Sequence, residues 1–228
     1  MEIRIDSLLE GAKKAEGTVV IVDVFRAFTT AAVALSRGAS TIILVGEPYE
    51  ALELRDKGVG DLCMEEVNGK RPEGFDFGNS PHELSRAHTK DKALIQSTRA
   101  GTAGATSALK ASAIYVASLV VAKATVEAIM QEHPPVVTIV AMGHNARTRT
   151  DEDELCALYI RNLLQQRQPD PDAIRRLILS SGEIAKYYDP QLPHFDPRDC
   201  EIALDINRFD FAIKLVRESN LLVARPHP

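Results

Sequence analysis

The sequence predicts an α/β protein in which a mostly parallel sheet is flanked by helices. Two observations predict this class. Short apolar, β-branched runs such as Thr18–Val22 and Thr41–Val45 have no polar interruption, which is typical of strands buried on both faces. Each run is followed by a polar turn and then by a segment that reads as a helix. Strands that alternate with helices in this way favour parallel pairing.

The elements of the first 150 residues follow from these patterns. Gly38 and Gly58 stand where two helices should end, and Pro48 occupies the first turn of the second of them. The predicted strands are residues 18–22, 41–45, 61–64, 93–96, 114–119 and 136–141, and the predicted helices are 31–36, 48–57, 101–110 and 122–132.

From Asp151 the pattern becomes helical, over residues 152–166, 171–179, 182–188 and 196–204. Apolar and polar residues then alternate from Phe209 to Leu215, which predicts a strand that forms a terminal hairpin with Leu221–Ala224. A helix over 210–218 is the alternative. We therefore expect residues 1–150 to form an α/β lobe with most of the site, and residues 151–228 a helical part with a terminal hairpin. The two would pack as one compact unit.

Composition excludes several classes of function. With 228 residues, 45% of them hydrophobic, the chain can bury a large core. A net charge of −5 without a basic cluster argues against nucleic acid as a partner. The most apolar stretch, residues 113–130, contains Lys123 and Glu127, so no membrane span is expected. Three widely spaced cysteines predict reduced thiols and a cytoplasmic protein. A homodimer is the default expectation for its assembly.

Polar residues follow most of the predicted strands. In open parallel sheets, ligands bind at the carboxyl ends of the strands. The mixture of carboxylates, hydroxyls and arginines there suits Mg²⁺ and phosphate, because Mg²⁺ takes oxygen ligands and arginine binds phosphate. These residues are Asp23, Arg26, Glu65, Glu66, Ser97, Thr98, Arg99, Ser118, Gly143, His144 and Asn145.

Two of the candidates, Asp23 and Asp153, have a structural alternative. Asp23 could bind a metal, attack phosphorus as a nucleophile, or only cap the following helix. Asp153 could bind metal or stabilise the start of its helix. His144 is the one histidine placed to act as an acid or base, and the histidine spacing predicts no zinc site.

The loop from Met64 to Pro81 is the most unusual segment. It carries four carboxylates, two basic residues and three glycines after a short strand. Loops of this length and composition commonly bind a ligand. The alternative is a surface loop held by Phe75 and Phe77.

Three segments resemble the ComB family, the 2-phosphosulfolactate phosphatases. They are Ile21–Thr30, Glu66–Pro81 with its Glu-Gly-Phe-Asp-Phe-Gly-Asn-Ser-Pro run, and Asp151–Cys156. The resemblance covers nearly the whole chain and implies a ComB-like fold. It also implies Mg²⁺-dependent hydrolysis of 2-phosphosulfolactate to sulfolactate and phosphate, a step towards coenzyme M.

One departure from the family pattern stands out. Many relatives read Thr-Thr-Asn-Gly-Thr-Arg where this chain has Ser97–Ala103, so the Asn and the Arg after Gly-Thr are missing. Arg99 could replace the lost charge. The residues that match the family by position are Asp23, Arg26, Thr29, Glu66, Glu73, Asp76, Asn79, Ser80, Gly101, Thr102 and Asp153.

We therefore predict a Mg²⁺-dependent phosphatase acting on a small anionic phosphate monoester. The alternatives are a non-catalytic anion-binding protein and a phosphoryl-transfer enzyme with another substrate. The predicted metal ligands are Asp23, Glu66, Asp76 and Asp153. The predicted catalytic residues are Asp23, Arg26 and Arg99, and the predicted substrate-binding residues are Asn79, Ser80, Thr98, Gly101, Thr102 and His144.

Overall fold

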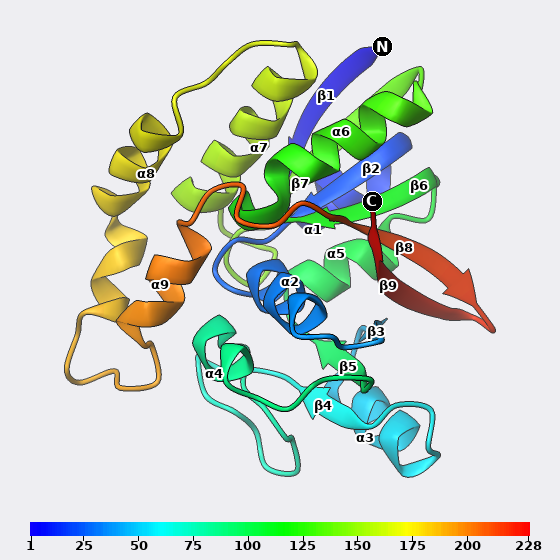
Figure 1. Ribbon diagram of the computed structural model, residues 1–228, viewed down its shortest axis with the longest axis vertical. Helices are drawn as coiled ribbons and strands as arrows, with labels where there is room; N and C mark the ends of the chain where they lie inside the picture. The colour runs from blue at the N-terminus through cyan, green and yellow to red at the C-terminus, as the bar shows by residue number, and fades with distance from the viewer.

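The computed structural model describes all 228 residues, and its strands join into one nine-stranded sheet (Figure 1). Their order across the sheet is β1-β7-β2-β6-β8-β9-β3-β5-β4. The predicted α/β class with a mostly parallel sheet is confirmed. The strands are β1 (Glu2–Ser7), β2 (Gly17–Val22), β3 (Thr41–Val45), β4 (Leu62–Met64), β5 (Ala93–Ser97), β6 (Ala111–Ala117), β7 (Val136–Ala141), β8 (Ala212–Glu218) and β9 (Leu221–His227).

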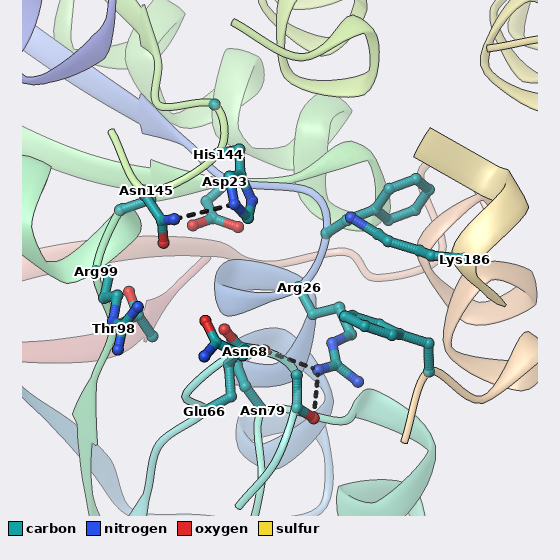
Figure 2. Close-up of a pocket in the computed structure, with 15 residues that line it drawn as sticks. Asp23, Arg26, Glu66, Asn68, Asn79, Thr98, Arg99, His144, Asn145 and Lys186 are labelled. Atoms are coloured by element: carbon teal, nitrogen blue, oxygen red, sulfur yellow. Dashed lines mark hydrogen bonds and ion pairs between the residues drawn. The ribbon is translucent and has the colours of Figure 1, made fainter. Parts of the chain in front are cut away.

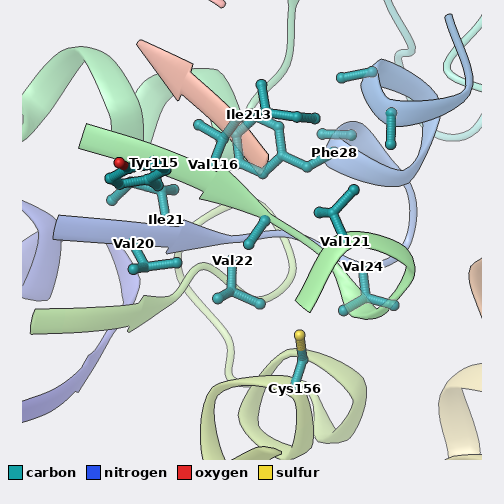
Figure 3. Close-up of a cluster of buried hydrophobic side chains, with 14 of the residues drawn as sticks. Val20, Ile21, Val22, Val24, Phe28, Tyr115, Val116, Val121, Cys156 and Ile213 are labelled. Carbon is teal, nitrogen blue, oxygen red and sulfur yellow. The ribbon is translucent and has the colours of Figure 1, made fainter. Parts of the chain in front are cut away.

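Helices cover both faces of the sheet. Phe28 of α2 packs on one face and Cys156 of α7 on the opposite one (Figure 3). None of the helices combines the length and the apolar character needed to cross a bilayer. The α-helices are α1 (Leu8–Lys14), α2 (Ala27–Ser36), α3 (Pro48–Asp56), α4 (Pro81–Ser85), α5 (Gly101–Ser107), α6 (Ala122–Glu132), α7 (Asp151–Leu164), α8 (Pro171–Leu179) and α9 (Pro197–Ala203), and the 3₁₀ helices are η1 (Leu119–Val121) and η2 (Gly182–Tyr187).

The predicted terminal hairpin is confirmed, and the alternative helix over 210–218 is wrong. Strands β8 and β9 pair antiparallel with each other, β8 with β6, and β9 with β3. The hairpin therefore lies in the centre of the sheet and joins two groups of parallel strands. Figure 1 shows the chain crossing from α9 to reach this position.

This arrangement has a geometric consequence for the site. Three successive antiparallel pairings separate the two groups: β6 with β8, β8 with β9, and β9 with β3. The strands β3, β5 and β4 therefore run in the opposite direction to β1, β7, β2 and β6. In a flat sheet the carboxyl ends of the two groups would lie at opposite edges. Gly101, which follows β5, nevertheless lies against Asp23, which follows β2: a Cβ atom on Gly101 would be 2.9 Å from Asp23 Oδ2. The sheet is therefore strongly twisted and curved, as large sheets are.

Strand β1, helices α1 and α4, and the 3₁₀ helix η1 have no counterpart in the predictions from sequence. Strand β1 pairs in parallel with β7 at the edge of the sheet, and its exposed and half-buried residues alternate. The charged residues Glu2, Arg4 and Asp6 make this segment look unlike a buried strand. Their alternation with Ile3 and Ile5 is nevertheless the period-two pattern of a strand. Helices α1 and α4 are each at most two turns long, too short for helical periodicity to reveal.

The core is built from the apolar strands identified in the sequence. Ile21, Phe28, Tyr115 and Ile213 have no exposed surface (Figure 3). All three cysteines are buried and unpaired, as expected. The buried β2 ends at Val22, directly before Asp23, so the core itself holds the first polar residue of the site in place.

Because the hairpin lies in the centre of the sheet, we expect substitutions along β8 to lower the free energy of unfolding by unequal amounts. Ile213→Ala removes a fully buried side chain and should lower the free energy of unfolding by about 2–5 kcal/mol. Val216→Ala, on the same strand but 42% exposed, should change it by less than about 1 kcal/mol. Urea denaturation measures both. Equal effects would contradict the placement of β8 in the sheet centre.

Candidate active site

A central pocket opens where loops from both groups of strands meet (Figure 2). It is narrow, with a volume of about 80 Å³, and most of its lining is polar. The expected convergence of residues that follow β2, β4, β5 and β7 is observed. The lining residues are Asp23, Phe25, Arg26, Glu66, Asn68, Gly69, Asn79, Thr98, Arg99, Ala100, Gly143, His144, Asn145, Lys186 and Phe195.

Asp23 lies at the base of this pocket, and only 6% of its surface is exposed. Its Oδ1 accepts a hydrogen bond from the backbone N–H of Ala27, 3.0 Å away, at the start of α2. Burial raises the pKa of the Asp23 carboxyl to about 6, and the nearby Glu66 carboxylate acts in the same direction. The N–H groups of Ala27 and Gly101 oppose this pKa rise. A cation bound next to Asp23 would favour the ionised form of this buried carboxyl.

Asp153 is buried behind the pocket and does not line it. Its Oδ1 accepts from Val24 N–H and its Oδ2 from Gly143 N–H, both at 2.7 Å. The side chain therefore ties the loop after β2 to the loop after β7. Burial, together with the Glu152 and Asp23 carboxylates, raises the pKa of Asp153 well above its usual range. This geometry supports the structural alternative for Asp153 over metal binding.

Arg26 is almost completely buried at the edge of the pocket, and protein groups already bind its guanidinium. One nitrogen donates to Asp199 Oδ2 at 2.8 Å, and the other donates to Glu66 Oε2 at 3.2 Å and to Gly69 O at 3.3 Å. The guanidinium also lies over the Phe195 ring. Arg26 therefore orients Glu66 and joins the 64–81 loop to α9.

Two further basic side chains reach the pocket. The exposed Arg99 side chain has no acidic partner in the protein. Lys186 extends from η2 towards the side of the pocket that holds Asp23 (Figure 2), and it pairs with Glu183 at 2.7 Å. Its charge lowers the pKa of Asp23. These two cations line the same pocket as the Asp23 and Glu66 carboxyl groups.

The turn between β5 and α5 is fixed by two threonines. The backbone N–H of Thr98 donates to Thr102 Oγ1 at 2.7 Å, and Thr102 N–H donates to Thr98 Oγ1 at 3.1 Å. Thr102 is fully buried and does not line the pocket. The backbone N–H groups of Arg99 and Ala100 in this turn have no acceptor in the protein. Thr102 thus shapes the turn, whereas Thr98 and the free N–H groups border the pocket.

The structure does not bring Asp76 or Ser80 to the pocket. Asp76 accepts from Cys63 N–H at 2.7 Å and from Arg55 at 3.1 Å, because its loop returns alongside β4. Ser80 caps α4 and donates to Asp199 Oδ1 at 2.6 Å. The expectation that both side chains point into the site is wrong.

Asn79, Glu66 and His144 do line the pocket. Asn79 is buried, and its Oδ1 accepts from Gln96 at 3.2 Å. Glu66 is half-buried and pairs with Arg26. His144 is exposed at the rim, with its Nε2 2.9 Å from Asn145 Nδ2.

The pocket offers only a few carboxylate ligands for Mg²⁺. No three His, Cys, Asp or Glu side chains are gathered into a ready-made metal cluster. Two of the four predicted ligands, Asp23 and Glu66, share the pocket, whereas Asp76 and Asp153 do not line it. Asp76 Oδ2 and both carboxyl oxygens of Asp153 accept from other groups. Mg²⁺ is commonly bound by one or two carboxylates, water and substrate phosphate. The Asp23–Glu66 pair meets that requirement.

Comparison with known proteins identifies the family. The family model for 2-phosphosulpholactate phosphatase matches residues 4–186. The chain belongs to this family. The resemblance of its motifs to the 2-phosphosulfolactate phosphatases is thereby confirmed, and the family is one of phosphoric monoester hydrolases.

Two relatives show how much of the chain this similarity covers. A probable 2-phosphosulfolactate phosphatase of Bacillus subtilis is 31% identical over 89% of this chain and 88% of its own length. The corresponding protein of Thermotoga petrophila is 34% identical, over 64% of this chain and 62% of its own length. Residues 187–228 lie beyond the family match, yet they supply Phe195 and Asp199 around Arg26.

Lys186, Phe195 and Asp199 are the residues that sequence reasoning missed. A single lysine in a helical segment looks the same as a solvated one, so no signal identifies Lys186. Asp199 had a weak signal, because it precedes Ala203 by one helical turn and so falls on the apolar face of α9. Its complete burial with Arg26 is a long-range contact.

Glu152, next to Asp153, provides a test of the electrostatics behind the pocket. It is 3% exposed, its Oε2 has no hydrogen-bond partner, and burial raises its pKa from 4.5 to about 7. The folded chain holds this proton more tightly than the unfolded chain, so stability is lost as the pH rises through about 7. Glu152→Gln removes the titration. Without divalent cations it should stabilise the protein by about 1–3 kcal/mol at pH 8 and by much less at pH 4.5.

Urea denaturation at the two pH values measures this difference. Glu127→Gln, which changes an exposed glutamate on α6, is the matched control and should show little dependence on pH. A Glu152→Gln effect that is the same at both pH values would contradict the raised pKa.

Proposed function

We propose that this protein is a Mg²⁺-dependent phosphatase that hydrolyses a small anionic phosphate monoester, with 2-phosphosulfolactate as the first candidate. The observation that carries this proposal is the central pocket, where Asp23 and Glu66 face Arg99 and Lys186. Family membership and the names of the relatives support the substrate class.

The basic groups would bind the phosphate. Arg99 forms no ion pair, although its charge lowers the pKa of Glu65, and it presents a planar set of donors that matches two phosphate oxygens. The unpaired N–H groups of Arg99 and Ala100 add two donors at the same turn. Lys186 adds positive charge from the opposite wall. Arg99 thus supplies the charge that the missing family arginine would provide.

Asp23 and Glu66 would hold the metal. Mg²⁺ there would neutralise charge on the phosphoryl oxygens and orient the ester. Arg26 holds Glu66 in place at 3.2 Å, and Asp199 in turn holds Arg26. Breaking such a buried ion pair by removing one partner costs about 3–5 kcal/mol, so this support is rigid.

Two routes for the attack on phosphorus differ in the role of Asp23. In one route, Asp23 attacks phosphorus, the ester oxygen leaves as the alcohol, and water then releases phosphate from the aspartyl phosphate. In the other, water attacks directly and Asp23 only holds the metal. Rapid-quench trapping separates them: a phosphorylated Asp23 supports the first route, and its absence during turnover supports the second.

Phosphate release from 2-phosphosulfolactate, with and without Mg²⁺, tests the proposed activity. Chelation should abolish turnover, and Mg²⁺ should restore it. Asp23→Asn should lower kcat/KM by about 10³-fold or more, because it weakens the metal site and removes the possible nucleophile. Arg99→Gln should lower it by about 10–100-fold, the loss expected for one charged hydrogen-bond donor.

Lys70→Gln is the matched control. Lys70 is an exposed base in the neighbouring loop that does not line the pocket, so its replacement should leave kcat/KM unchanged. Thermal unfolding checks that each variant is folded. Binding of phosphate without Mg²⁺-dependent release from any phosphorylated hydroxy acid would instead favour the non-catalytic anion-binding alternative.

A further inference from the structure

A second cavity, which we call the side pocket, adjoins the central pocket. The two share Thr98, Arg99 and Asn145. The side pocket has a volume of about 590 Å³ against about 80 Å³ for the central pocket. A phosphate bound in the narrow pocket would therefore leave the rest of its substrate to extend into the wider one.

Two arginines in the side pocket have no acidic partner. Arg99 stands at the junction of the pockets, and Arg147 comes from the loop after β7. Neither side chain makes an ion pair or hydrogen bond within the protein. The neighbouring Arg149, in contrast, pairs with Glu154 at 2.7 Å and lines neither pocket. The free pair is suited to a carboxylate or sulfonate.

Glu65 adds an unsatisfied acceptor to the same cavity. It lines the side pocket, whereas its neighbour Glu66 lines the central one, as expected for consecutive residues in extended backbone. Glu65 is 1% exposed, its Oε1 accepts from Glu66 N–H, and its Oε2 has no hydrogen-bond partner. A buried acceptor without a partner is rare in folded proteins and destabilises the folded state.

Other charged groups do not fill this need. Glu47 also lines the side pocket, but it forms no ion pair with Arg99 or Arg147. Ser97 and Arg99 also line the cavity and lower the pKa of Glu65, yet Glu65 Oε2 has no hydrogen-bond partner. The cavity thus presents two arginines that form no ion pair and a buried carboxyl oxygen without a partner.

We propose that the side pocket is a substrate subsite for an acid that carries a free hydroxyl or ammonium group. The acid binds Arg99 and Arg147, and the hydroxyl or ammonium donates to Glu65. This inference rests on the proposed phosphatase function. It also goes beyond it, because 2-phosphosulfolactate has a carboxylate and a sulfonate but no free hydroxyl, and so leaves Glu65 without a donor.

Matched esters test the subsite. 2-Phosphoglycerate and 2-phospholactate differ by one hydroxyl, so we expect kcat/KM to be about 10-fold or more higher for 2-phosphoglycerate. Glu65→Met should remove most of this preference, and Glu65→Gln, which retains an oxygen acceptor, should keep part of it. Equal kcat/KM for the two esters would overturn the proposal.

The acid contact is tested with a second pair. 2-Phosphoglycerate and glycerol 2-phosphate differ in the carboxylate, and Arg147→Gln should lower the ratio of their kcat/KM values by about 10-fold. Arg149→Gln, on the same loop, should leave that ratio unchanged. An Arg147→Gln ratio equal to the parent value would overturn the role of Arg147.

Failure of the proposed function would look different. If no ester is hydrolysed, the phosphatase proposal falls, and calorimetry of 2-phosphoglycerate and 2-phospholactate binding still tests the subsite. Tighter binding of 2-phosphoglycerate that is lost in Glu65→Met would support the subsite, whereas equal binding of the two esters would overturn it. If 2-phosphosulfolactate is hydrolysed but kcat/KM is the same for 2-phosphoglycerate and 2-phospholactate, the phosphatase proposal stands and the subsite proposal is wrong.

Discussion

Two buried carboxylates hold the site together. Asp153 accepts from the N–H groups of Val24 and Gly143, and Asp23 accepts from that of Ala27. Removing a carboxylate from water is expensive, and backbone N–H groups offset only part of that cost here, since burial still raises the pKa of both acids. The same contacts hold the loops after β2 and β7 at fixed positions. The burial of Asp23 and Asp153 therefore depends on these two loops lying close together, and the pocket lies where they meet.

The hairpin imposes a second constraint. It fills the centre of the sheet between two parallel groups that run in opposite directions. The twist and curvature of the sheet bring Gly101 against Asp23, where glycine is required because a side chain would meet both Asp23 and Phe28. Arg99 and Glu66, which follow the neighbouring parallel strands β5 and β4, therefore share a pocket with Asp23, which follows β2. This meeting of the two strand groups follows from the topology of the sheet.

Much of the fold and part of the site could be predicted from sequence. Uninterrupted apolar runs identify the buried strands in the sequence. The rule that ligands bind at the carboxyl ends of parallel strands correctly selected Asp23, Arg99 and His144 as pocket residues. The direction of a loop side chain could not be predicted. Asp76 turns towards Arg55 because its loop runs back along β4, which no local pattern reveals.

Long-range packing accounts for the remaining misses. Lys186 and Asp199 come from the helical C-terminal part and reach the site only in the folded chain. The central place of β8 and β9 was likewise hidden, because period-two alternation predicts a strand without naming its neighbours. These contacts depend on the arrangement of the whole sheet.

The most direct test of the central pocket as the active site is a crystal structure with Mg²⁺ and phosphate bound. We expect Mg²⁺ at the oxygens of Asp23 and Glu66, and phosphate against Arg99 and the N–H groups of the Thr98–Gly101 turn. Both ions bound away from Asp23 and Glu66 would contradict the assignment of this pocket.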